Sequence, residues 1–225
     1  RALAAQFWPG ALTLVLPKKD TISDLVTAAL PSVAVRIPEH PIFRSLLERL
    51  EFPLAAPSAN PFGYVSPTLA EHVASTLGDR ILAVIDGGAC KHGVESTIVD
   101  LRNPDAPKIL RPGPLSAEQL GMQDVEMELK QGSNKLAQAA PGMLTQHYSP
   151  NTPITLFGHD EQPNNVQKSE AVLFNTKPTG KVAENTFWLS ESGDLTEIAH
   201  NLFMLIQKLD VRDYTHLKVE RAEHV

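Results

Sequence analysis

The hydrophobic positions of the first 120 residues fall into short apolar runs that are separated by turns rich in proline and glycine. Such runs are typical of strands buried in a sheet. We expect strands at 12–16, 33–37, 54–56, 81–85, 95–101 and 108–110. Between them, apolar residues return with the spacing of one helical face, as in the expected helix 41–50. The alternation of strands and helices predicts an α/β fold with a mixed sheet.

Several expected helices have a recognisable first turn. Ser23 or Asp24 can cap a helix through residue 29, and Ser116 with Gln119 opens a short helix. Another helix ends near residue 77 and has two competing starts, either Ser66 before a proline or a capping box at 68–71. Ser66 can therefore be a cap, and this role is compatible with ligand contact because a helix N-terminus favours anions.

The pattern changes after residue 120. Hydrophobic periodicity lapses over 121–153, where Gln, Ser, Asn, Ala, Gly and Pro dominate, so we expect a connector. Its part 143–150 is too aromatic and too rich in flanking prolines for an inert tether, and we expect it to dock. Beyond it the pattern predicts a helix at 195–209 and strands at 154–157, 171–174, 187–189 and 217–219. The predicted domains are thus 1–120, a linker or lid at 121–153, and a smaller α/β domain at 154–225.

Composition narrows the function classes. The chain has 225 residues, 42% of them hydrophobic and 20% charged, which is typical of one large or two modest globular domains. Its net charge of −6 argues against a sequence-wide attraction to nucleic acid or anionic membrane. No apolar run is long enough for a bilayer span, and the single Cys90 fits a reducing compartment, so we expect a cytoplasmic protein.

The stretch 54–68 is the most informative part of the chain. An apolar run ends there in small residues and breaks into a loop that is stiffened by Pro57, Pro61 and Pro67. The loop offers several polar side chains, namely Ser58, Asn60, Tyr64 and Ser66. A polar loop at the carboxyl end of a strand is where open α/β folds bind ligands.

Other polar groups also follow expected strands. Arg36 and Arg111 stand at strand ends, and Ser96 and Thr97 lie at the mouth of another strand. An arginine in an apolar run needs a partner. Arg36 can therefore be an edge-strand residue, a member of an internal ion pair, or a ligand contact. Two arginines with several hydroxyls suit a bound phosphate and carboxylate, held by orientation and charge.

Three other chemistries are disfavoured. The eight histidines are scattered and no paired cysteines occur, so we expect no metal held by protein ligands. The sequence also contains neither of the two common phosphate-binding motifs, Gly-x-x-x-x-Gly-Lys-Ser/Thr and Gly-x-Gly-x-x-Gly. Ser58, His72 and Asp86 can be drawn as a triad, but no nucleophile elbow surrounds the serine, and the histidine lies within an expected helix.

Five motifs in order carry a family resemblance. They are 32–38 (Ser-Val-Ala-Val-Arg-Ile-Pro), 56–60 (Ala-Pro-Ser-Ala-Asn) with 66–68 (Ser-Pro-Thr), 95–100 (Glu-Ser-Thr-Ile-Val-Asp), 111–113 (Arg-Pro-Gly) and 147–150 (His-Tyr-Ser-Pro). Together they resemble the threonylcarbamoyl-AMP synthases, in the longer form that joins a YrdC-like domain to a smaller domain. The resemblance implies a twisted mixed YrdC-like sheet with flanking helices, then a linker and a Rossmann-like α/β domain.

The resemblance also implies a reaction. L-threonine, bicarbonate and ATP would give threonylcarbamoyl-AMP and pyrophosphate, which serve the formation of N6-threonylcarbamoyladenosine in tRNA. The threonine amine captures bicarbonate as a carbamate, and the carbamate oxygen attacks the α-phosphorus of ATP. Mg²⁺ is expected through the phosphates. The product would pass to the tRNA threonylcarbamoyl-transfer machinery.

Residue roles follow by motif. The threonine site implied by the resemblance has Arg36 on the carboxylate, with Ala56 and Ser96 in the pocket and Thr97 beside it. The implied ATP contacts are Ser32, Ser58, Ser66 and Arg111, with Asn60 as a neighbour. His147 and Tyr148 would form a lid over the nucleotide from the linker.

One departure limits the match. The family's Lys/Arg-containing motif and part of its threonine pocket lie in an N-terminal portion that this sequence does not contain. Because the chain also lacks an initiator Met and stops abruptly at Val225, we expect a fragment of a longer protein. Two alternatives stay open, a non-catalytic RNA- or nucleotide-binding module and a carbamoyl-transfer enzyme. The acidic balance disfavours the first, and the His-Tyr-Ser-Pro linker disfavours the second.

Overall fold

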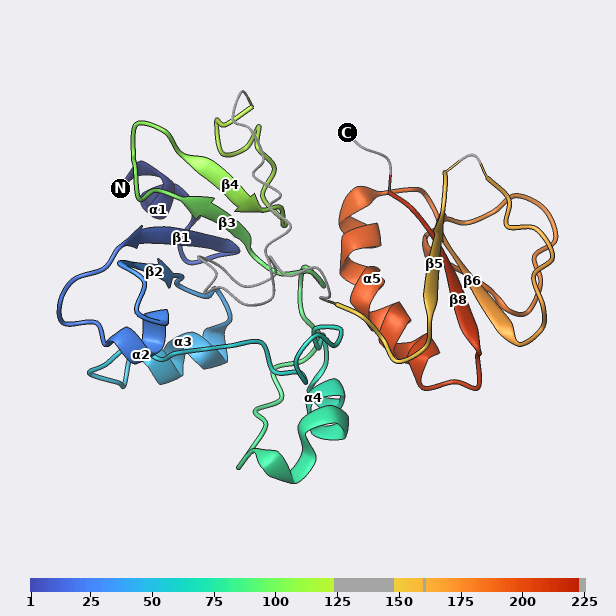
Figure 1. The fold of residues 1–225 in the computed structure, drawn as a ribbon, viewed down its shortest axis with the longest axis horizontal. Coiled ribbons are helices and arrows are strands. Elements are labelled where there is room, and N and C mark those ends of the chain that lie inside the picture. The colour runs from blue at the N-terminus through green and yellow to red at the C-terminus, as the bar shows by residue number, and fades with distance from the viewer. Residues whose placement is uncertain (124–147, 160, 223–225) are drawn as a thin grey trace. The chain divides into compact units, whose positions relative to one another are not determined.

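A computed structural model describes residues 1–123, 148–159 and 161–222. These residues form two compact units, the first made of Arg1–Pro57 with Glu95–His147 and the second of Ser58–Val94 with Tyr148–Val225. Each unit has its own sheet (Figure 1). The α/β class and the mixed sheet expected from the sequence are confirmed. The expected domain boundaries at residues 120 and 153 remain predictions.

The first unit is built on a mixed sheet of order β2-β1-β3-β4. The central pair, β1 and β3, is parallel, whereas β2 and β4 pair antiparallel with their neighbours. The strands are β1 (Leu12–Pro17), β2 (Ser32–Val35), β3 (Thr97–Asp100) and β4 (Lys108–Arg111). The helices are α1 (Ala2–Phe7), α2 (Asp24–Thr27) and α3 (Pro41–Leu47).

The core of the first unit lies on the two central strands. Alternate residues of β1 enter different hydrophobic clusters, as the two-residue period of a strand requires. Leu12 and Leu14 pack with Val99, whereas Val15 packs with Ile98. All five side chains are buried. The two central strands are therefore anchored in the core, and the polar groups at their ends follow a buried backbone.

Two expected strands, 54–56 and 81–85, are wrong. Both segments lie outside any helix or strand, and Leu82 and Ile85 are among the most exposed hydrophobic residues. A strand needs a neighbour for its backbone N–H and C=O groups. Neither segment pairs with an edge of either sheet. Hydrophobic composition alone therefore overstated the strand content.

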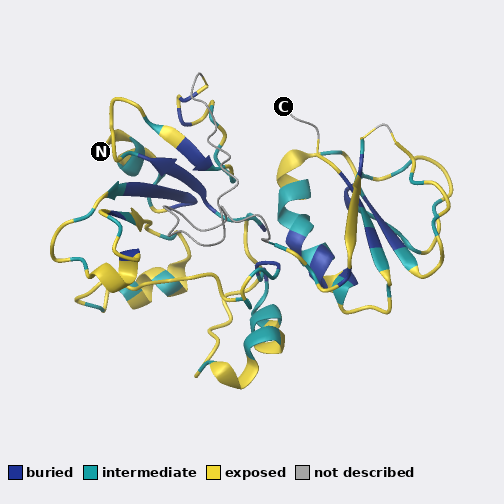
Figure 2. Ribbon diagram, in the orientation of Figure 1, coloured by how far each residue is buried: buried dark blue, intermediate teal, exposed yellow. Residues whose placement is uncertain are grey.

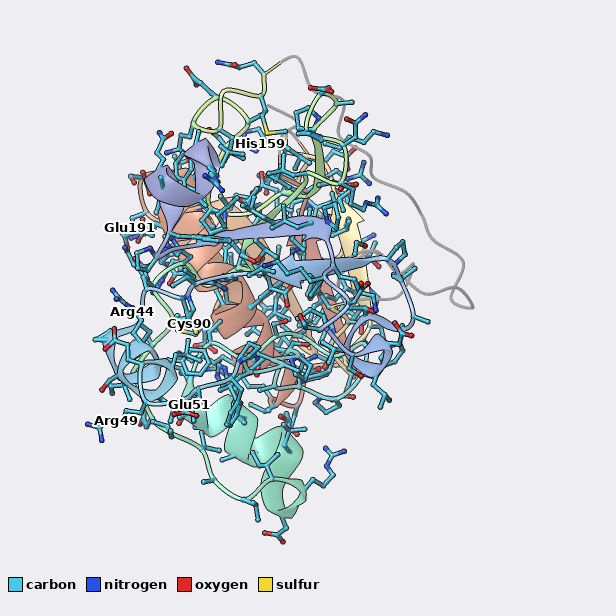
Figure 3. All side chains as sticks on the ribbon, turned by 90° about the vertical axis from the view of Figure 1, so that its left-hand side faces the viewer. Arg44, Arg49, Glu51, Cys90, His159 and Glu191 are labelled. Atoms are coloured by element: carbon cyan, nitrogen blue, oxygen red, sulfur yellow. The ribbon has the colours of Figure 1, made fainter. Side chains whose placement is uncertain are left out.

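The second expected strand, 33–37, is present but not buried as predicted. It forms β2, at the edge of the sheet, and its residues Ala34 and Val35 are exposed. The expected helix 41–50 is also shorter, ending at residue 47. Figure 3 labels Arg44 on this helix, where its side chain forms an exposed ion pair with Glu48 at 3.1 Å. Cys90, labelled there too, is exposed.

The predicted caps had mixed outcomes. Ser23 caps α2, accepting a hydrogen bond from the Leu25 N–H at 3.3 Å. Ser116 and Gln119 exchange the two hydrogen bonds of a capping box, but around a turn rather than a helix. The capping box at 68–71 is wrong: α4 (Ala70–Leu77) begins after Leu69 without a side-chain cap, and the 3-10 helix η1 (Gly78–Arg80) follows.

The second unit has a wholly parallel sheet of order β5-β8-β6-β7. Its strands are β5 (Ile154–Phe157), β6 (Glu170–Thr176), β7 (Thr186–Ser190) and β8 (His216–Glu220). The helix α5 (Leu195–Asp210) starts at Asp194, whose side chain caps the Glu197 N–H. Figure 2 shows the exposed edge strand β5 beside the more buried β8.

The core of this unit includes a residue from a distant loop. The buried side chains of β6, β8 and α5 form its main cluster, and Val65, only 1% exposed, belongs to the same cluster. Stretch 54–68 is therefore partly a core element of the second unit. Across the described ranges, no helix has both the length and the apolar character to cross a membrane.

Candidate functional site

In the first unit, Arg111 organises the end of β4. Its guanidinium forms an ion pair with the Glu95 carboxylate through Nη1. Nε and Nη2 donate to the Ser96 carbonyl oxygen at 3.1 and 3.0 Å, and Nη2 also donates to the Ser96 hydroxyl at 3.1 Å. Both charged side chains are mostly buried, so the pair is only weakly screened by water. Arg111 and Ser96, predicted from separate motifs, are brought together.

Gly113 makes this junction possible. A Cβ atom at this position would lie 2.4 Å from the Thr97 nitrogen and 2.5 Å from the Glu95 carbonyl oxygen. Both atoms belong to the backbone and cannot move aside cheaply. The Arg-Pro-Gly turn therefore packs directly on the chain that enters β3, and only glycine permits the approach.

The two predicted hydroxyls of this segment have different surroundings. Ser96 Oγ lies 2.7 Å from Thr13 Oγ1, and both residues are buried. Thr97 is fully buried, and its hydroxyl both donates to the Leu115 carbonyl and accepts from the Leu115 N–H, each at 3.0 Å. These bonds tie Thr97 to the turn after β4, which fits a role in holding the site rather than contacting a ligand.

The remaining predicted residues of this unit lie near the sheet edge. Ser32 is the buried first residue of β2. Arg36 directly follows this strand, and its Nε donates to the Gly10 carbonyl oxygen at 2.9 Å. Arg36 therefore lies beside the edge strand of the sheet, and its contact with a ligand remains a prediction. Ala56 is exposed and lies outside any helix or strand.

In the second unit, the loop 58–66 turns on Asn60. Its Nδ2 donates to the carbonyl oxygens of Pro61 and Tyr64, each at 3.0 Å. Its Oδ1 atom is buried and has no hydrogen-bond partner among the described residues. Ser58, at the start of the loop, is exposed. Asn60 thus stabilises the turn and presents an acceptor atom.

The end of the loop is attached to α5. The Tyr64 hydroxyl donates to Asp210 Oδ2 at 2.6 Å, and the buried Gln207 Nε2 donates to the Ser66 carbonyl oxygen at 2.7 Å. Burial, with the hydrogen bond and charge of Asp210 adding to it, raises the pKa of Tyr64 well above its usual range. Ser66 itself is buried.

Tyr148 belongs to the same unit. Its ring stacks on Phe203 of α5 with centroids 5.2 Å apart and an interplanar angle of 27°. Its φ of 61° lies in the left-handed region, which is uncommon for a residue with a side chain. The following N–H, of Ser149, donates to the Gly63 carbonyl oxygen at 2.9 Å. His147, the other lid residue predicted, lies outside the described residues.

The structure does not support a catalytic triad of Ser58, His72 and Asp86. The Thr68 N–H donates to His72 Nδ1 at 3.3 Å, and the Gly88 N–H donates to Asp86 Oδ1 at 2.8 Å. Each side chain is thus engaged in its own local turn. Burial lowers the pKa of His72, against an opposing effect of Glu71. Within the described ranges, no group of three or more His, Cys, Asp or Glu residues is placed to hold a metal ion.

Sequence reasoning missed three polar residues that contact the predicted site residues or their loop, namely Glu95, Gln207 and Asp210. The sequence contained a signal for Glu95, because this residue directly precedes Ser96 in the motif 95–100. Gln207 and Asp210 had no such signal, since they lie about 140 residues from their loop partners and look like ordinary residues of an amphipathic helix.

The fold and these groups define a class of protein: an α/β protein in which a mixed sheet with arginine and hydroxyl groups at its strand ends is joined to a unit with a parallel sheet. A family model described as telomere recombination, for the Sua5, YciO and YrdC proteins, matches residues 1–113. A second model, described as the C-terminal domain of threonylcarbamoyl-AMP synthase, matches residues 115–224. The chain therefore belongs to the Sua5/YrdC family, in its two-domain form.

Curated relatives agree with this membership. The threonylcarbamoyl-AMP synthase of Pyrococcus abyssi is 38% identical over 223 residues, which cover 92% of this chain and 64% of that protein. The synthase of Bacillus subtilis is 44% identical over 161 residues, covering 69% and 46% respectively. That of Schizosaccharomyces pombe is 34% identical over 248 residues, covering 97% and 60%. The chain thus spans between about half and two thirds of the length of these relatives.

Solved structures show the same architecture. The crystal structure of Pyrococcus abyssi Sua5 in complex with L-threonine is 34% identical and has a TM-score of 0.83, covering 99% of this chain and 68% of that one. A variant of the same protein, with an adjacent histidine and tyrosine both replaced by alanine, has a TM-score of 0.79.

Proposed function

We propose that the protein is an L-threonylcarbamoyladenylate synthase, which forms threonylcarbamoyl-AMP and pyrophosphate from L-threonine, bicarbonate and ATP. The observation that carries the proposal is the similarity, over 99% of the chain, to a protein crystallised with L-threonine. The names of the curated relatives support the same reaction. The product would serve tRNA modification, and the cytoplasm is the expected compartment.

The chemistry requires positioning rather than a covalent nucleophile. The threonine nitrogen attacks the bicarbonate carbon, and loss of water leaves a carbamate. A carbamate oxygen then attacks the α-phosphorus of ATP while the bond to the β-phosphate oxygen breaks, releasing pyrophosphate. Charge accumulates on the phosphoryl oxygens in this step, so donors and cations fixed beforehand lower the barrier most.

The residues of the first unit fit the anionic parts of these substrates. Arg36 would bind the threonine carboxylate, with Ala56 and Ser96 lining the pocket. Arg111 would contact the ATP phosphates together with Ser32. The contacts of Arg111 to Glu95 and to the Ser96 carbonyl support this role, because they fix the guanidinium before ATP arrives.

The residues of the second unit fit the nucleotide. Ser58 and Ser66 would contact ATP, with Asn60 as a neighbour and Tyr148 covering the nucleotide beside His147. The buried Oδ1 of Asn60 supports a polar contact at this loop, since a buried acceptor is stabilised by a donor. Mg²⁺ would neutralise the phosphates. Since the described residues contain no suitable cluster of ligands, we expect it to be held mainly through ATP itself.

The direct test uses the full-length protein with ATP, bicarbonate, L-threonine and Mg²⁺. We expect threonylcarbamoyl-AMP, detected by mass spectrometry, and one pyrophosphate for each product molecule. L-alanine in place of threonine is the control for the amino-acid site, and omission of bicarbonate is the control for the carbamate. Release of pyrophosphate without threonine, or no turnover at all, would overturn the proposal.

A further inference from the structure

The last two turns of α5 carry a set of contacts that the proposed reaction does not use directly. Gln207 is 5% exposed, although glutamine is mostly found on protein surfaces. Its Nε2 donates to the Ser66 carbonyl oxygen at 2.7 Å, and both residues are buried. A buried amide is retained only where it is hydrogen-bonded. The contact therefore fixes the backbone of a residue proposed to bind ATP.

Asp210, one turn further, gathers three donors on its carboxylate. They are the Tyr64 hydroxyl at 2.6 Å, the Thr152 N–H at 2.7 Å and the Asn151 Nδ2 at 3.1 Å. An acidic residue at the end of a helix is opposed by the helix dipole, so these donors must stabilise it. Tyr64 belongs to the loop 58–66, whereas Asn151 and Thr152 follow Tyr148. The Asp210 carboxylate thus joins the loop 58–66 and the segment after Tyr148, both proposed to contact ATP, to α5.

Apolar contacts join the same segments to the same helix. Val65 is 1% exposed and lies in the core cluster that contains Phe203. The ring of Tyr148 stacks on Phe203. The two segments also contact each other, through the hydrogen bond from the Ser149 N–H to Gly63. Hydrogen bonds and apolar contacts therefore connect the loop 58–66 and Tyr148 both to α5 and to each other.

A further loop lies on the first half of α5. His200 Nδ1 lies 2.9 Å from the Lys91 carbonyl oxygen. Gly93 approaches so closely that a Cβ atom would lie 2.1 Å from the His200 carbonyl oxygen. The contact of α5 with residues 58–94 thus extends along much of the helix.

We propose that α5 is the positioning element of the nucleotide site, and that Gln207 and Asp210 are positioning residues for ATP. This inference rests on the proposed function for the identity of the ligand. It assigns a task to the C-terminal part of the chain: holding Ser66 and Tyr148 in the arrangement that binds ATP. Neither Gln207 nor Asp210 touches the nucleotide in this proposal; each acts through its partner on the loop.

The test compares ATP binding with threonine use in the full-length protein. The variants are Tyr64→Phe, Asp210→Asn and the double variant, with Tyr214→Phe and Asp213→Asn as matched controls from the same unit. Tyr214 packs against Phe187 and Asp213 is exposed. Calorimetry with MgATP and no threonine gives Kd, and steady-state assays give kcat with KM for each substrate.

We expect Asp210→Asn to raise the Kd and KM for ATP about tenfold. A charge-assisted hydrogen bond is weakened in this variant, and part of that loss should reach ATP binding through the loop. The KM for threonine should change less than about twofold, a separation that general destabilisation would not produce. Tyr64→Phe should have a smaller effect in the same direction, and the double variant should resemble Asp210→Asn because the two groups act as a pair. The controls should bind ATP like the wild type.

Unchanged ATP affinity in folded Tyr64→Phe and Asp210→Asn proteins would overturn the inference and leave the proposed function standing. A wild-type protein that binds ATP but makes no threonylcarbamoyl-AMP would overturn the function, while the calorimetric comparison still decides the role of α5. A wild-type protein that binds no ATP would overturn both. If Asp210→Asn fails to fold, the milder Tyr64→Phe, judged against Tyr214→Phe, carries the test.

Discussion

The guanidinium of Arg111 is held by the carboxylate of Glu95 at the point where β4 ends. Removing that charge with Glu95→Gln should leave the arginine in place through its bonds to the Ser96 carbonyl but orient it less strictly. We expect kcat/KM for ATP to fall about tenfold, equivalent to ~1.4 kcal/mol. Glu118→Gln, at an exposed position of the same unit, is the control. Equal kinetics for the two variants would show that the pair has no role in orientation.

Gly113→Ala should destabilise the first unit. The added methyl group meets two backbone atoms closer than 2.6 Å, so β3 or the turn must shift. We expect a loss of about 1–3 kcal/mol in the free energy of unfolding, as for other overpacked sites. Thermal unfolding measures the loss. Gly158→Ala is the comparison, because its nearest neighbours belong to the flexible Glu161 side chain, and a similar drop there would contradict this argument.

Thr97 offers a test with two conservative replacements. Thr97→Val keeps the shape but leaves the N–H and C=O of Leu115 without their hydroxyl partner in a buried place. We expect a cost of about 1–3 kcal/mol in the free energy of unfolding. Thr97→Ser retains both bonds and should lose less. Urea unfolding of the three proteins would settle the order, and a serine variant weaker than the valine variant would refute the hydrogen-bond account.

The carboxylate of Asp210 gives a pH dependence of known sign. Burial acts to raise its pKa, but the hydrogen bonds from Tyr64, Thr152 and Asn151 outweigh burial and hold the pKa below the ordinary value of 3.8. A depressed folded-state pKa stabilises the fold above the unfolded-state value and loses that effect as the pH falls through the folded-state value. The stability difference between wild type and Asp210→Asn should therefore be constant above about pH 5 and shrink below about pH 4. Asp213→Asn, at an exposed position of the same unit, is the control for the loss of one carboxylate.

Tyr148 provides a test of the proposed lid. Tyr148→Phe keeps the ring that stacks on Phe203, whereas Tyr148→Ala removes it. We expect the alanine variant to bind ATP about tenfold more weakly, ~1.4 kcal/mol, and the phenylalanine variant to bind within about threefold of the wild type. Circular dichroism should show the fold intact in both. An alanine variant with normal ATP affinity would argue against the lid.

Local pattern predicted much of the fold. Apolar runs bounded by turn residues correctly predicted β1, β3, β4 and the strands of the second unit, and each of these strands pairs with a neighbour. The segments 54–56 and 81–85 failed because strand formation depends on a partner edge, which composition does not encode. Similarly, the capping box predicted at 68–71 does not form. The Thr68 N–H instead donates to the His72 side chain four residues later.

Contacts among the predicted residues could be anticipated where these residues are near one another in sequence. Glu95, Ser96 and Thr97 form one motif, and Arg111 returns to it through an antiparallel pair only 15 residues away. The contact of α5 with the loop was not predictable, because Gln207 and Ser66 are 141 residues apart in the sequence. Only the folded chain reveals that a helix of the C-terminal part reaches the loop singled out from the sequence.

Val65 has a consequence for how the protein can be divided. The polypeptide passes between the two units after residues 57, 94 and 147, so neither unit is a continuous stretch. A chain cut at residue 120 would keep the polar loop but leave Val65 without the apolar neighbours that cover it. Such a truncated protein should expose apolar surface and aggregate. The segment matched by the first family model thus contributes a residue to the core of the second unit.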